Sequence, residues 1–307
     1  MGKSRKCKHY LKVIQFNNNV ESLVKVVKET QVDGIIVRAS VVNKDVIQAS
    51  KNLKVIIKHG VGYNNIDIGV AKKLHIPVLY TPDANFESVA EFTVGLLYLL
   101  CKKYSSFDQE LRIRHNWDKN KCQTFELKNK CLGLIGLGRI GRRVVGLVSP
   151  LNMRILVYDP YLPLNQFPVS VKRVMFLDEL LKKSDFVSIH CPSNKETHHM
   201  LEEDELKKMK KSAYLINTAR GDIIKETAII KALKNHWIAG IAIDTFDKEP
   251  PDLSGELFNL SNLVATPHVA GTARESFIRM GINSAELILK VLNNRINEID
   301  DRFFVVR

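Results

Sequence analysis

The chain has 307 residues, of which 45% are hydrophobic and 26% are charged, and these are the proportions of an ordinary globular protein. The length is sufficient for two domains, each with its own core. Its apolar runs are too short to cross a bilayer, and its basic first residues lack the apolar stretch and cleavage site of a signal peptide. These features argue against a membrane-spanning protein.

The formal net charge of +13 raises the question of an anionic partner. Lysines occur in most segments, however, and no basic stripe is interleaved with aromatic residues, so we expect no nucleic-acid partner. The five cysteines form no C-x-x-C pair. We therefore expect reduced thiols, a cytoplasmic location and no metal centre.

The first part of the chain alternates short β-branched runs with helical patterns. This alternation predicts right-handed crossovers and a parallel sheet, with ligands at the carboxyl ends of the strands. Arg38 and the loop 59–65 lie at that edge. The expected strands are Lys12–Gln15, Gly34–Val37, Lys54–Ile57 and Val78–Tyr80, and the expected helices are Val20–Glu29, Asn43–Ala49 and Ile68–Leu74.

A long helix is expected from Asn85 to about Tyr104, with Ser88 and Glu91 as a capping box. A helix of this length between two α/β units suits a connection between domains. The segment Phe107–Lys130 is polar and mixed, and we predict no element in it.

A glycine-rich turn follows the apolar run Cys131–Ile135. Gly136, Gly138 and Gly141 have the order G-x-G-x-x-G, and a helical pattern begins directly after them. The first glycine suits a tight turn, the second a close approach of pyrophosphate, and the third close packing of helix on strand. The exposed N–H groups at the helix start attract phosphate. The alternative is a purely structural strand–turn–helix.

The context favours the dinucleotide-binding interpretation. Met153–Tyr158 predicts a second buried strand, and Asp159 follows it, eighteen residues after Gly141 (159 − 141). An acid at roughly this offset binds the ribose hydroxyls of the cofactor. No arginine follows directly, and a carboxylate would repel a 2′-phosphate, so we expect NAD rather than NADP.

Strands and helices alternate again after Asp159. Three polar residues stand just beyond expected strand ends: Arg220, Glu249 and His268. The expected strands are Phe186–His190, Ala213–Asn217, Ile238–Ile243 and Leu263–Thr266, and we expect the last of them to be buried. The expected helices are Asp178–Lys183, Glu202–Met209, Glu226–Lys234 and Ala273–Asn293.

Arg220, Glu249 and His268 together suit the oxidation of a hydroxy acid. Arginine binds a carboxylate in two-point geometry, and histidine exchanges a hydroxyl proton near neutral pH. A carboxylate beside the histidine favours its charged form and fixes which ring nitrogen faces the substrate. Taken singly, each has an ordinary structural explanation: a surface ion pair, a solvated loop acid, or a helix-capping histidine.

Six motifs, in the order found here, resemble those of the D-isomer-specific 2-hydroxyacid dehydrogenase family, and the resemblance covers nearly the whole chain. The motifs are Val61-Gly62 with Asn65-Ile66-Asp67, Thr81-Pro82 through Val89-Ala90-Glu91, Gly136-Leu-Gly-Arg-Ile-Gly141, Asn217-Thr-Ala-Arg-Gly221, Asp244-Thr-Phe-Asp-Lys-Glu-Pro-Pro251 and Thr266-Pro-His-Val-Ala-Gly271.

This resemblance implies an NAD-dependent oxidoreductase in which Arg220, Glu249 and His268 are catalytic and Asp159 binds ribose. Glu249 separates the chain from the related formate dehydrogenases, which carry glutamine there. The backbone of Val61 and Gly62 would hold the substrate carboxylate. Besides the glycine loop, the implied cofactor contacts are Arg139, Ile140, Cys191, Pro192, Thr218, Ala219, Asp244 and Gly271.

The resemblance extends to phosphoglycerate dehydrogenases in the segment Val37–Ser40, whose Arg38 would help to hold a phosphate. Lys58 and Lys119 stand where that subfamily has two further arginines. The ammonium group of lysine is a point charge and lacks the two-point hydrogen-bonding geometry of a guanidinium. We expect 3-phosphoglycerate as the first substrate, with glyoxylate or hydroxypyruvate reduction second. A non-catalytic NAD-sensing corepressor-like protein is the alternative from another class. A regulatory domain for serine feedback is not expected.

The expected fold is therefore α/β, with two doubly wound parallel-sheet domains. A flavodoxin-like substrate domain would comprise residues 1–100 and 286–307, to which the tail Ile296–Val306 returns. A Rossmann NAD-binding domain would comprise residues 101–285. The resemblance also suggests a homodimer in which the long helix after Asn85 takes part.

Overall fold

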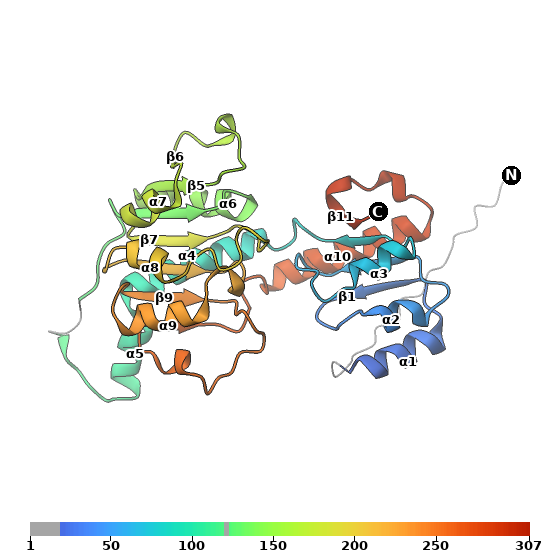
Figure 1. Cartoon of the computed structure of the whole chain (residues 1–307), viewed down its shortest axis with the longest axis horizontal. Helices are drawn as coiled ribbons and strands as arrows, with labels where there is room; N and C mark the ends of the chain where they lie inside the picture. The colour runs from blue at the N-terminus through green and yellow to red at the C-terminus, as the bar shows by residue number, and fades with distance from the viewer. Residues whose placement is uncertain (1–18, 120–122) are drawn as a thin grey trace. The chain divides into compact units, whose positions relative to one another are not determined.

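The computed structural model describes residues 19–119 and 123–307, which form two compact units. The first unit consists of the described residues up to Ala84 together with Ile278–Arg307, and the second is Asn85–Phe277 (Figure 1). The expected strand Lys12–Gln15 lies outside the described residues, as do Cys7 and Cys122.

The first unit is built on a four-stranded sheet with the order β1-β2-β3-β11. The first three strands are parallel, and β11 from the C-terminal tail pairs antiparallel with β3, so the tail returns to this unit as predicted. The strands are β1 (Gly34–Val37), β2 (Val55–Lys58), β3 (Val78–Tyr80) and β11 (Phe304–Val306).

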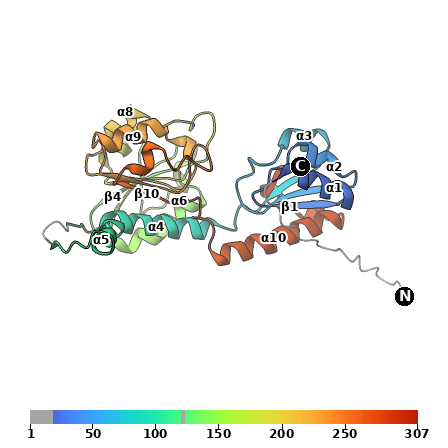
Figure 2. The same cartoon turned by 90° about the horizontal axis from the view of Figure 1, so that it is seen from below.

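Helices cover both faces of this sheet (Figure 2). On one face lie α1 (Val20–Thr30), α2 (Lys44–Ala49) and α3 (Ile68–Lys73), whose apolar residues share a core with Ile56 and Val78. On the other face α10 (Arg274–Leu292) places Leu287, Ile288 and Val291 against Val55, Ile57 and Leu79. Every residue of β2 is buried, as expected for a strand covered on both sides.

The second unit contains a seven-stranded sheet with the order β10-β9-β8-β7-β4-β5-β6, and all its pairings are parallel. The strands are β4 (Cys131–Ile135), β5 (Arg154–Tyr158), β6 (Lys172–Arg173), β7 (Phe186–Ile189), β8 (Tyr214–Asn217), β9 (Gly240–Ile243) and β10 (Leu263–Ala265). The strand order reverses between β4 and β7. This is the topological switch point at which ligands bind in open α/β sheets, beyond the carboxyl ends of the strands.

Two helical layers enclose the second sheet (Figure 2). One contains α4 (Phe86–Lys102) and α6 (Arg139–Val148), which pack closely on one another, and α5 (Tyr104–Arg112) follows α4. The other contains α7 (Leu177–Lys183), α8 (Glu203–Lys208) and α9 (Glu226–Lys234). Each face has its own buried cluster, and Phe186 is fully buried.

Short 3₁₀ helices complete the two units, at Ser149–Leu151, Leu164–Gln166, Gly221–Ile223, Glu256–Asn259, Ile296–Glu298 and Asp301–Phe303.

The α/β class with parallel sheets is confirmed, and three local expectations differ from the structure. The capping box is wrong: α4 begins at Phe86, Asn85 makes no side-chain cap, and Ser88 is buried within the helix. Helix α5 was not predicted because most of its residues are polar and none of them is buried against a core. Strand β10 was expected to be buried but is partly exposed at the edge of the sheet.

The limits of the two units also differ from the expected domain limits. The chain divides after Ala84 and after Phe277, whereas residues 100/101 and 285/286 were expected. The expected positions fall inside α4 and α10. A continuous helical pattern does not show which turns pack on which sheet, and only the tertiary contacts decide this.

Candidate active site

The glycine loop lies at the carboxyl end of β4, at the switch point. Gly136 has a φ of 93°, and a Cβ there would lie 2.8 Å from the backbone nitrogen of Cys191. A Cβ on Gly141 would lie 2.6 Å from the carbonyl oxygen of Gly136. A Cβ on Gly138 would meet no atom within 4 Å, so this residue faces open space. Gly136 thus allows the tight turn, Gly138 leaves an open approach to the backbone, and Gly141 allows the helix to pack closely on the turn, as expected.

Helix α6 begins at Arg139, with Gly138 as its N-cap and no side-chain cap hydrogen bond. Its first N–H groups therefore face the open side of the loop, where a helix N-terminus favours an anion. Asp159 is fixed beside this loop. Its Oδ2 accepts a hydrogen bond from the Leu137 N–H at 2.9 Å, and its Oδ1 accepts from the N–H groups of Tyr161 and Leu162 at 3.1 Å. This arrangement fits the pyrophosphate and ribose of a dinucleotide.

The loop after β7 lies next to the glycine turn, because Cys191 touches Gly136. Burial raises the pKa of the Cys191 thiol to about 11, so the group remains protonated and is a poor nucleophile. Its neighbour His190 exchanges a hydrogen bond with the Ser188 hydroxyl through Nε2 at 2.9 Å. Desolvation lowers the pKa of His190 to about 4, which keeps this ring neutral.

The loop after β8 carries Arg220 and is braced by the side chain of Asn217. This side chain donates to the Arg220 carbonyl at 2.7 Å and accepts from the Ala219 N–H at 3.0 Å. Thr218 exchanges a hydrogen bond with Thr93 of α4 at 2.9 Å, and both hydroxyls are buried. Arg220 is half-buried, and its Nη1 donates to the Ala219 carbonyl at 2.6 Å.

The loops after β8 and β9 are pressed together at Gly221. A Cβ on this glycine would lie 1.9 Å from the carbonyl carbon of Phe246 and 2.3 Å from the nitrogen of Asp247. No side chain fits there. The position therefore requires glycine, and the close contact sets Arg220 beside the loop that leads to Glu249.

Asp244 holds the loop that carries His268. Its fully buried carboxylate accepts hydrogen bonds from the Thr266 hydroxyl at 2.6 Å and from the N–H groups of Val269 and Ala270 at 2.9 Å. These donors lie on both sides of His268, which has a left-handed φ of 53°. The loop around the histidine is thus fixed by one charged group.

Glu249 and His268 are hydrogen-bonded to one another at this edge. The Nδ1 of His268 lies 2.8 Å from the Oε2 of Glu249, whose Oε1 accepts a hydrogen bond from the Phe246 N–H at 3.1 Å. Both side chains are partly exposed. Because Nδ1 faces the carboxylate, Nε2 is the ring nitrogen left to meet a substrate.

The structure therefore brings most of the expected residues of the second unit to one edge. The loops after β4, β5, β7, β8, β9 and β10 all leave carboxyl ends of parallel strands. They contain the three glycines, Asp159, Cys191, Arg220, Glu249 and His268. Gly271 also lies close to the start of α4, since a Cβ there would be 2.8 Å from Asn85 Nδ2.

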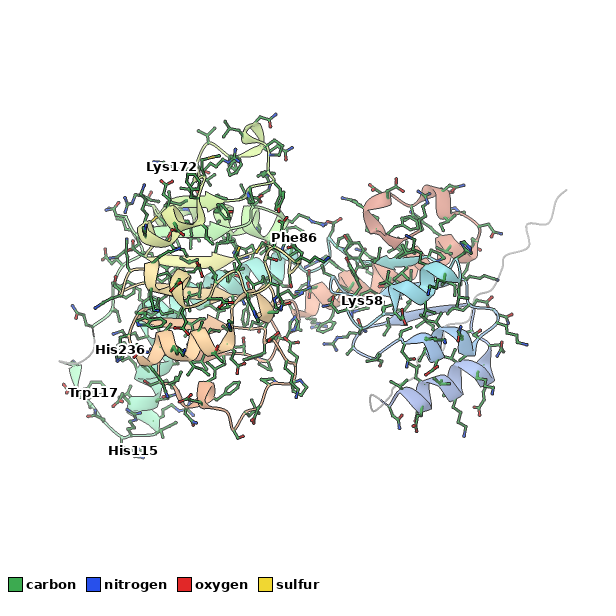
Figure 3. The ribbon with its side chains drawn as sticks, viewed as in Figure 1. Lys58, Phe86, His115, Trp117, Lys172 and His236 are labelled. Atoms are coloured by element: carbon green, nitrogen blue, oxygen red, sulfur yellow. The ribbon has the colours of Figure 1, made fainter. Side chains whose placement is uncertain are left out.

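In the first unit, the expected substrate residues follow strand ends as predicted. Lys58, however, is engaged locally: its Nζ donates to the Arg38 carbonyl and to Asn65 Oδ1, the latter at 2.7 Å. Asn65 in turn donates to the Ser40 carbonyl at 2.7 Å. Lys58 is 8% exposed and lies on β2 (Figure 3). It holds the Arg38 loop in place, a role that no pattern in the sequence indicates.

Lys119 does not lie with the other expected residues of the second unit. Its ammonium lies over the ring of Trp117, 5.6 Å from the ring centroid. Trp117 is labelled in Figure 3, at the end of the second unit where α5 lies. Both residues line a groove of about 850 Å³ with Tyr214, Ala239 and Val264. Those three residues are near the starts of β8, β9 and β10. Lys119 is therefore at the amino edge of the sheet, opposite the edge of Arg220.

Several supporting residues were missed by sequence reasoning, including Thr93, Ser193 and Asp222. Their signals are weak because each is a small polar residue whose partner lies far away in the chain. Asp247 lies 4.0 Å from the Nε2 of His199, which is a further contact between residues far apart in the chain. Among the described residues, no helix is long and apolar enough to span a bilayer.

A parallel α/β sheet with this glycine loop, a ribose-type acid and a glutamate–histidine pair defines a dinucleotide-dependent oxidoreductase. Comparison with known proteins specifies the class. Residues 94–270 match the family model described as D-isomer specific 2-hydroxyacid dehydrogenase, NAD binding domain. The chain belongs to this family; it is an oxidoreductase with NAD as its cofactor.

Three curated relatives illustrate the range of this family. A glyoxylate reductase of Thermofilum pendens is 41% identical over 261 residues, which cover 83% of this chain and 76% of that one. A hydroxypyruvate reductase of Thermotoga maritima is 37% identical over 288 residues, with coverage of 93% and 92%. A D-3-phosphoglycerate dehydrogenase of Methanocaldococcus jannaschii is 38% identical over 280 residues, with coverage of 91% and 53%.

Solved structures agree with this assignment. The TT0316 protein from Thermus thermophilus is 30% identical with a TM-score of 0.85, covering 96% of this chain and 91% of that one. D-Lactate dehydrogenase from Aquifex aeolicus, complexed with NAD and lactic acid, is 28% identical with a TM-score of 0.82. The similarity covers 92% of this chain and 89% of that one.

The low pKa of His190 makes the stability of the second unit depend on pH. The unfolded chain binds a proton at this histidine below about pH 6.5, whereas the folded protein does not until about pH 4. The stability that the neutral His190 contributes is therefore fully present above the unfolded pKa of 6.5. It is lost as the pH falls from there toward about 4. We expect His190 to account for about 2 kcal/mol of destabilisation between pH 7 and pH 5.

Urea unfolding at the two pH values measures this effect. Both tryptophans, Trp117 and Trp237, lie in the second unit, so their fluorescence reports on it. The loss on acidification should shrink in His190→Gln and remain in His236→Gln, whose histidine is exposed and labelled in Figure 3. An equal pH dependence in the two variants would contradict the assignment.

Proposed function

We propose that this chain interconverts a small D-2-hydroxy acid and the corresponding 2-oxo acid, using Arg220, Glu249 and His268 as its catalytic groups. The observation that carries the proposal is the 2.8 Å contact between His268 and Glu249 at the carboxyl edge of the NAD-domain sheet. Arg220 supports it from the adjoining loop, which Gly221 presses against Phe246.

In this mechanism His268 handles the proton and Arg220 handles the carboxylate. The Nε2 of His268 accepts the proton of the substrate hydroxyl during oxidation and returns it during reduction. Glu249 holds Nδ1 and stabilises the ring when both nitrogens carry protons. The Arg220 guanidinium binds the substrate carboxylate in two-point geometry, which orients the carbon that reacts. NAD, when bound, supplies the hydride acceptor for the oxidation.

The cofactor contacts follow the same edge. We propose that the N–H groups at Gly138, Arg139 and Ile140 hold the pyrophosphate and that Asp159 holds the adenosine ribose. Further contacts are proposed at Gly136, Gly141, Cys191, Pro192, Thr218, Ala219, Asp244 and Gly271. Asp244 already accepts three hydrogen bonds, and a carboxylate accepts about four, so its carboxylate has room for about one further donor.

For the substrate, we propose glyoxylate or hydroxypyruvate first and 3-phosphoglycerate second, which reverses the order expected from the sequence. The two lysines expected at a phosphate subsite are placed differently, and the Lys58 ammonium donates to the Arg38 carbonyl and to Asn65 Oδ1. Lys119 lies at the opposite edge of its sheet from Arg220. Arg38, Val61 and Gly62 remain the proposed substrate contacts. 3-Phosphoglycerate remains the second candidate because the Arg38 guanidinium would help to hold its phosphate.

We also propose a cytoplasmic homodimer. The described cysteines Cys101, Cys131 and Cys191 are free, as in a reducing compartment. Leu111 and Trp117 line the groove at the amino edge of the second sheet, and both side chains are exposed. Exposed apolar side chains that gather at one place favour a protein interface there.

The test of this function is NADH oxidation with glyoxylate, hydroxypyruvate, phosphohydroxypyruvate and pyruvate. We expect turnover with at least one acid and the highest kcat/KM with glyoxylate or hydroxypyruvate. A higher value with phosphohydroxypyruvate would restore 3-phosphoglycerate as the substrate. NADH binding without turnover of any of these acids would contradict the enzymatic proposal and favour an NAD-sensing protein.

Replacement of His268 by alanine should lower turnover about a hundredfold or more, because no other group would exchange the hydroxyl proton. The variant is measured beside His236→Ala, which removes an exposed histidine of the same unit. NADH affinity, followed by fluorescence, should change little in both. Near-normal turnover in His268→Ala would refute the role of this residue.

Asp159→Asn removes the charge that excludes a 2′-phosphate and retains an acceptor for the backbone N–H groups at this position. We expect the ratio of kcat/KM with NADPH to that with NADH to rise about tenfold or more. Asp252→Asn, on an exposed loop of the same unit, is the control. An unchanged ratio would mean that another group binds the ribose.

A further inference from the structure

A short hydrogen bond joins two loops of the proposed site through residues that the mechanism does not use. The Ser193 hydroxyl donates to Asp222 Oδ2 at 2.6 Å. This distance is at the short end of the range for O–H···O hydrogen bonds. Ser193 lies two residues after Cys191, and Asp222 lies two residues after Arg220. The bond therefore ties the loop after β7 to the loop that carries the guanidinium.

The backbone of the Arg220 loop is held from two directions. From the side of β8, Asn217 binds the Arg220 carbonyl and the Ala219 N–H. From the side of β7, the N–H of His199 donates to the Asp222 carbonyl at 2.7 Å, and Ser193 holds the Asp222 side chain. Arg220 lies between these two anchors.

The carboxylate of Asp222 is only partly satisfied. Its Oδ1 is buried and has no hydrogen-bond partner in the structure. A buried acceptor without a partner destabilises a fold, and such groups occur most often where a site requires them. The Ser193 hydroxyl is thus the hydrogen-bond donor that holds the Asp222 carboxylate, through Oδ2.

We propose that Asp222 is a positioning residue for Arg220 and that the Ser193 hydroxyl is the group that fixes it. This inference rests on the proposed function, in which Arg220 binds the substrate carboxylate. Loss of the Ser193 hydroxyl frees the Asp222 side chain, and the Arg220 loop then samples orientations that do not meet the carboxylate. The affinity for the acid falls, while the groups that bind NADH and move the proton are unchanged.

The experiment compares Ser193→Ala, Ser193→Thr and Ser254→Ala in the full chain, using the best acid from the substrate screen. Ser254 is a matched control, because its hydroxyl donates to Asp252 at the same distance of 2.6 Å on an exposed loop of the same unit. In Ser193→Ala we expect the KM for the acid to rise about tenfold. The kcat and the dissociation constant for NADH should each change less than about threefold.

Ser193→Thr retains the hydroxyl and should restore the KM, and Ser254→Ala should have no effect. Hydrogen exchange of residues 220–225, measured with and without NADH, should accelerate in Ser193→Ala alone. This readout needs no substrate.

Three results would overturn the inference. They are an unchanged KM and unchanged exchange in Ser193→Ala, a parallel rise in the NADH dissociation constant, or a fall in kcat with no recovery in Ser193→Thr. Failure of the proposed function is seen separately, as an inactive wild-type chain in the same assay. Hydrogen exchange then decides by itself whether Ser193 holds the Arg220 loop.

Discussion

The buried carboxylate of Asp244 is the interaction on which the proposed chemistry depends. It accepts three hydrogen bonds from residues on both sides of His268, and hydrogen bonds to a charged group contribute about 1.5–3 kcal/mol each. The histidine itself has a left-handed backbone and is partly exposed, so its own packing does not fix its position. Asp244 supplies this constraint, and the contact between His268 and Glu249 follows from it.

Close backbone contacts give the rest of the edge its shape. Gly136 touches the backbone of Cys191, and Gly221 touches the peptide between Phe246 and Asp247. In each case a single methyl group would collide with main-chain atoms, which do not move as a side chain does. Gly136 therefore joins the loops after β4 and β7, and Gly221 joins the loops after β8 and β9. The hydrogen bond between Ser193 and Asp222 adds a polar connection to these steric ones.

Charge alone is a poor guide to the substrate of this protein. Lysines are numerous, and two of them, Lys58 and Lys119, were expected at a phosphate subsite. Lys58 instead stabilises the loop of Arg38, and Lys119 lies over Trp117. A cation contributes to a phosphate site only when its donors face the ligand. This is why the proposal moves to acids without a phosphate.

The sequence by itself determined the alternation of strands and helices in the described residues, the glycine turn and the candidate residues beyond the strand ends. These features are local: periodicity and glycine spacing depend on neighbours in the chain, and parallel strands bring their carboxyl ends to one edge. Only the tertiary structure decided that the units divide before α4 and within α10, which lysines have partners, and how Asp222 is held. Those outcomes depend on atoms that are far apart in the sequence, and no local pattern records them.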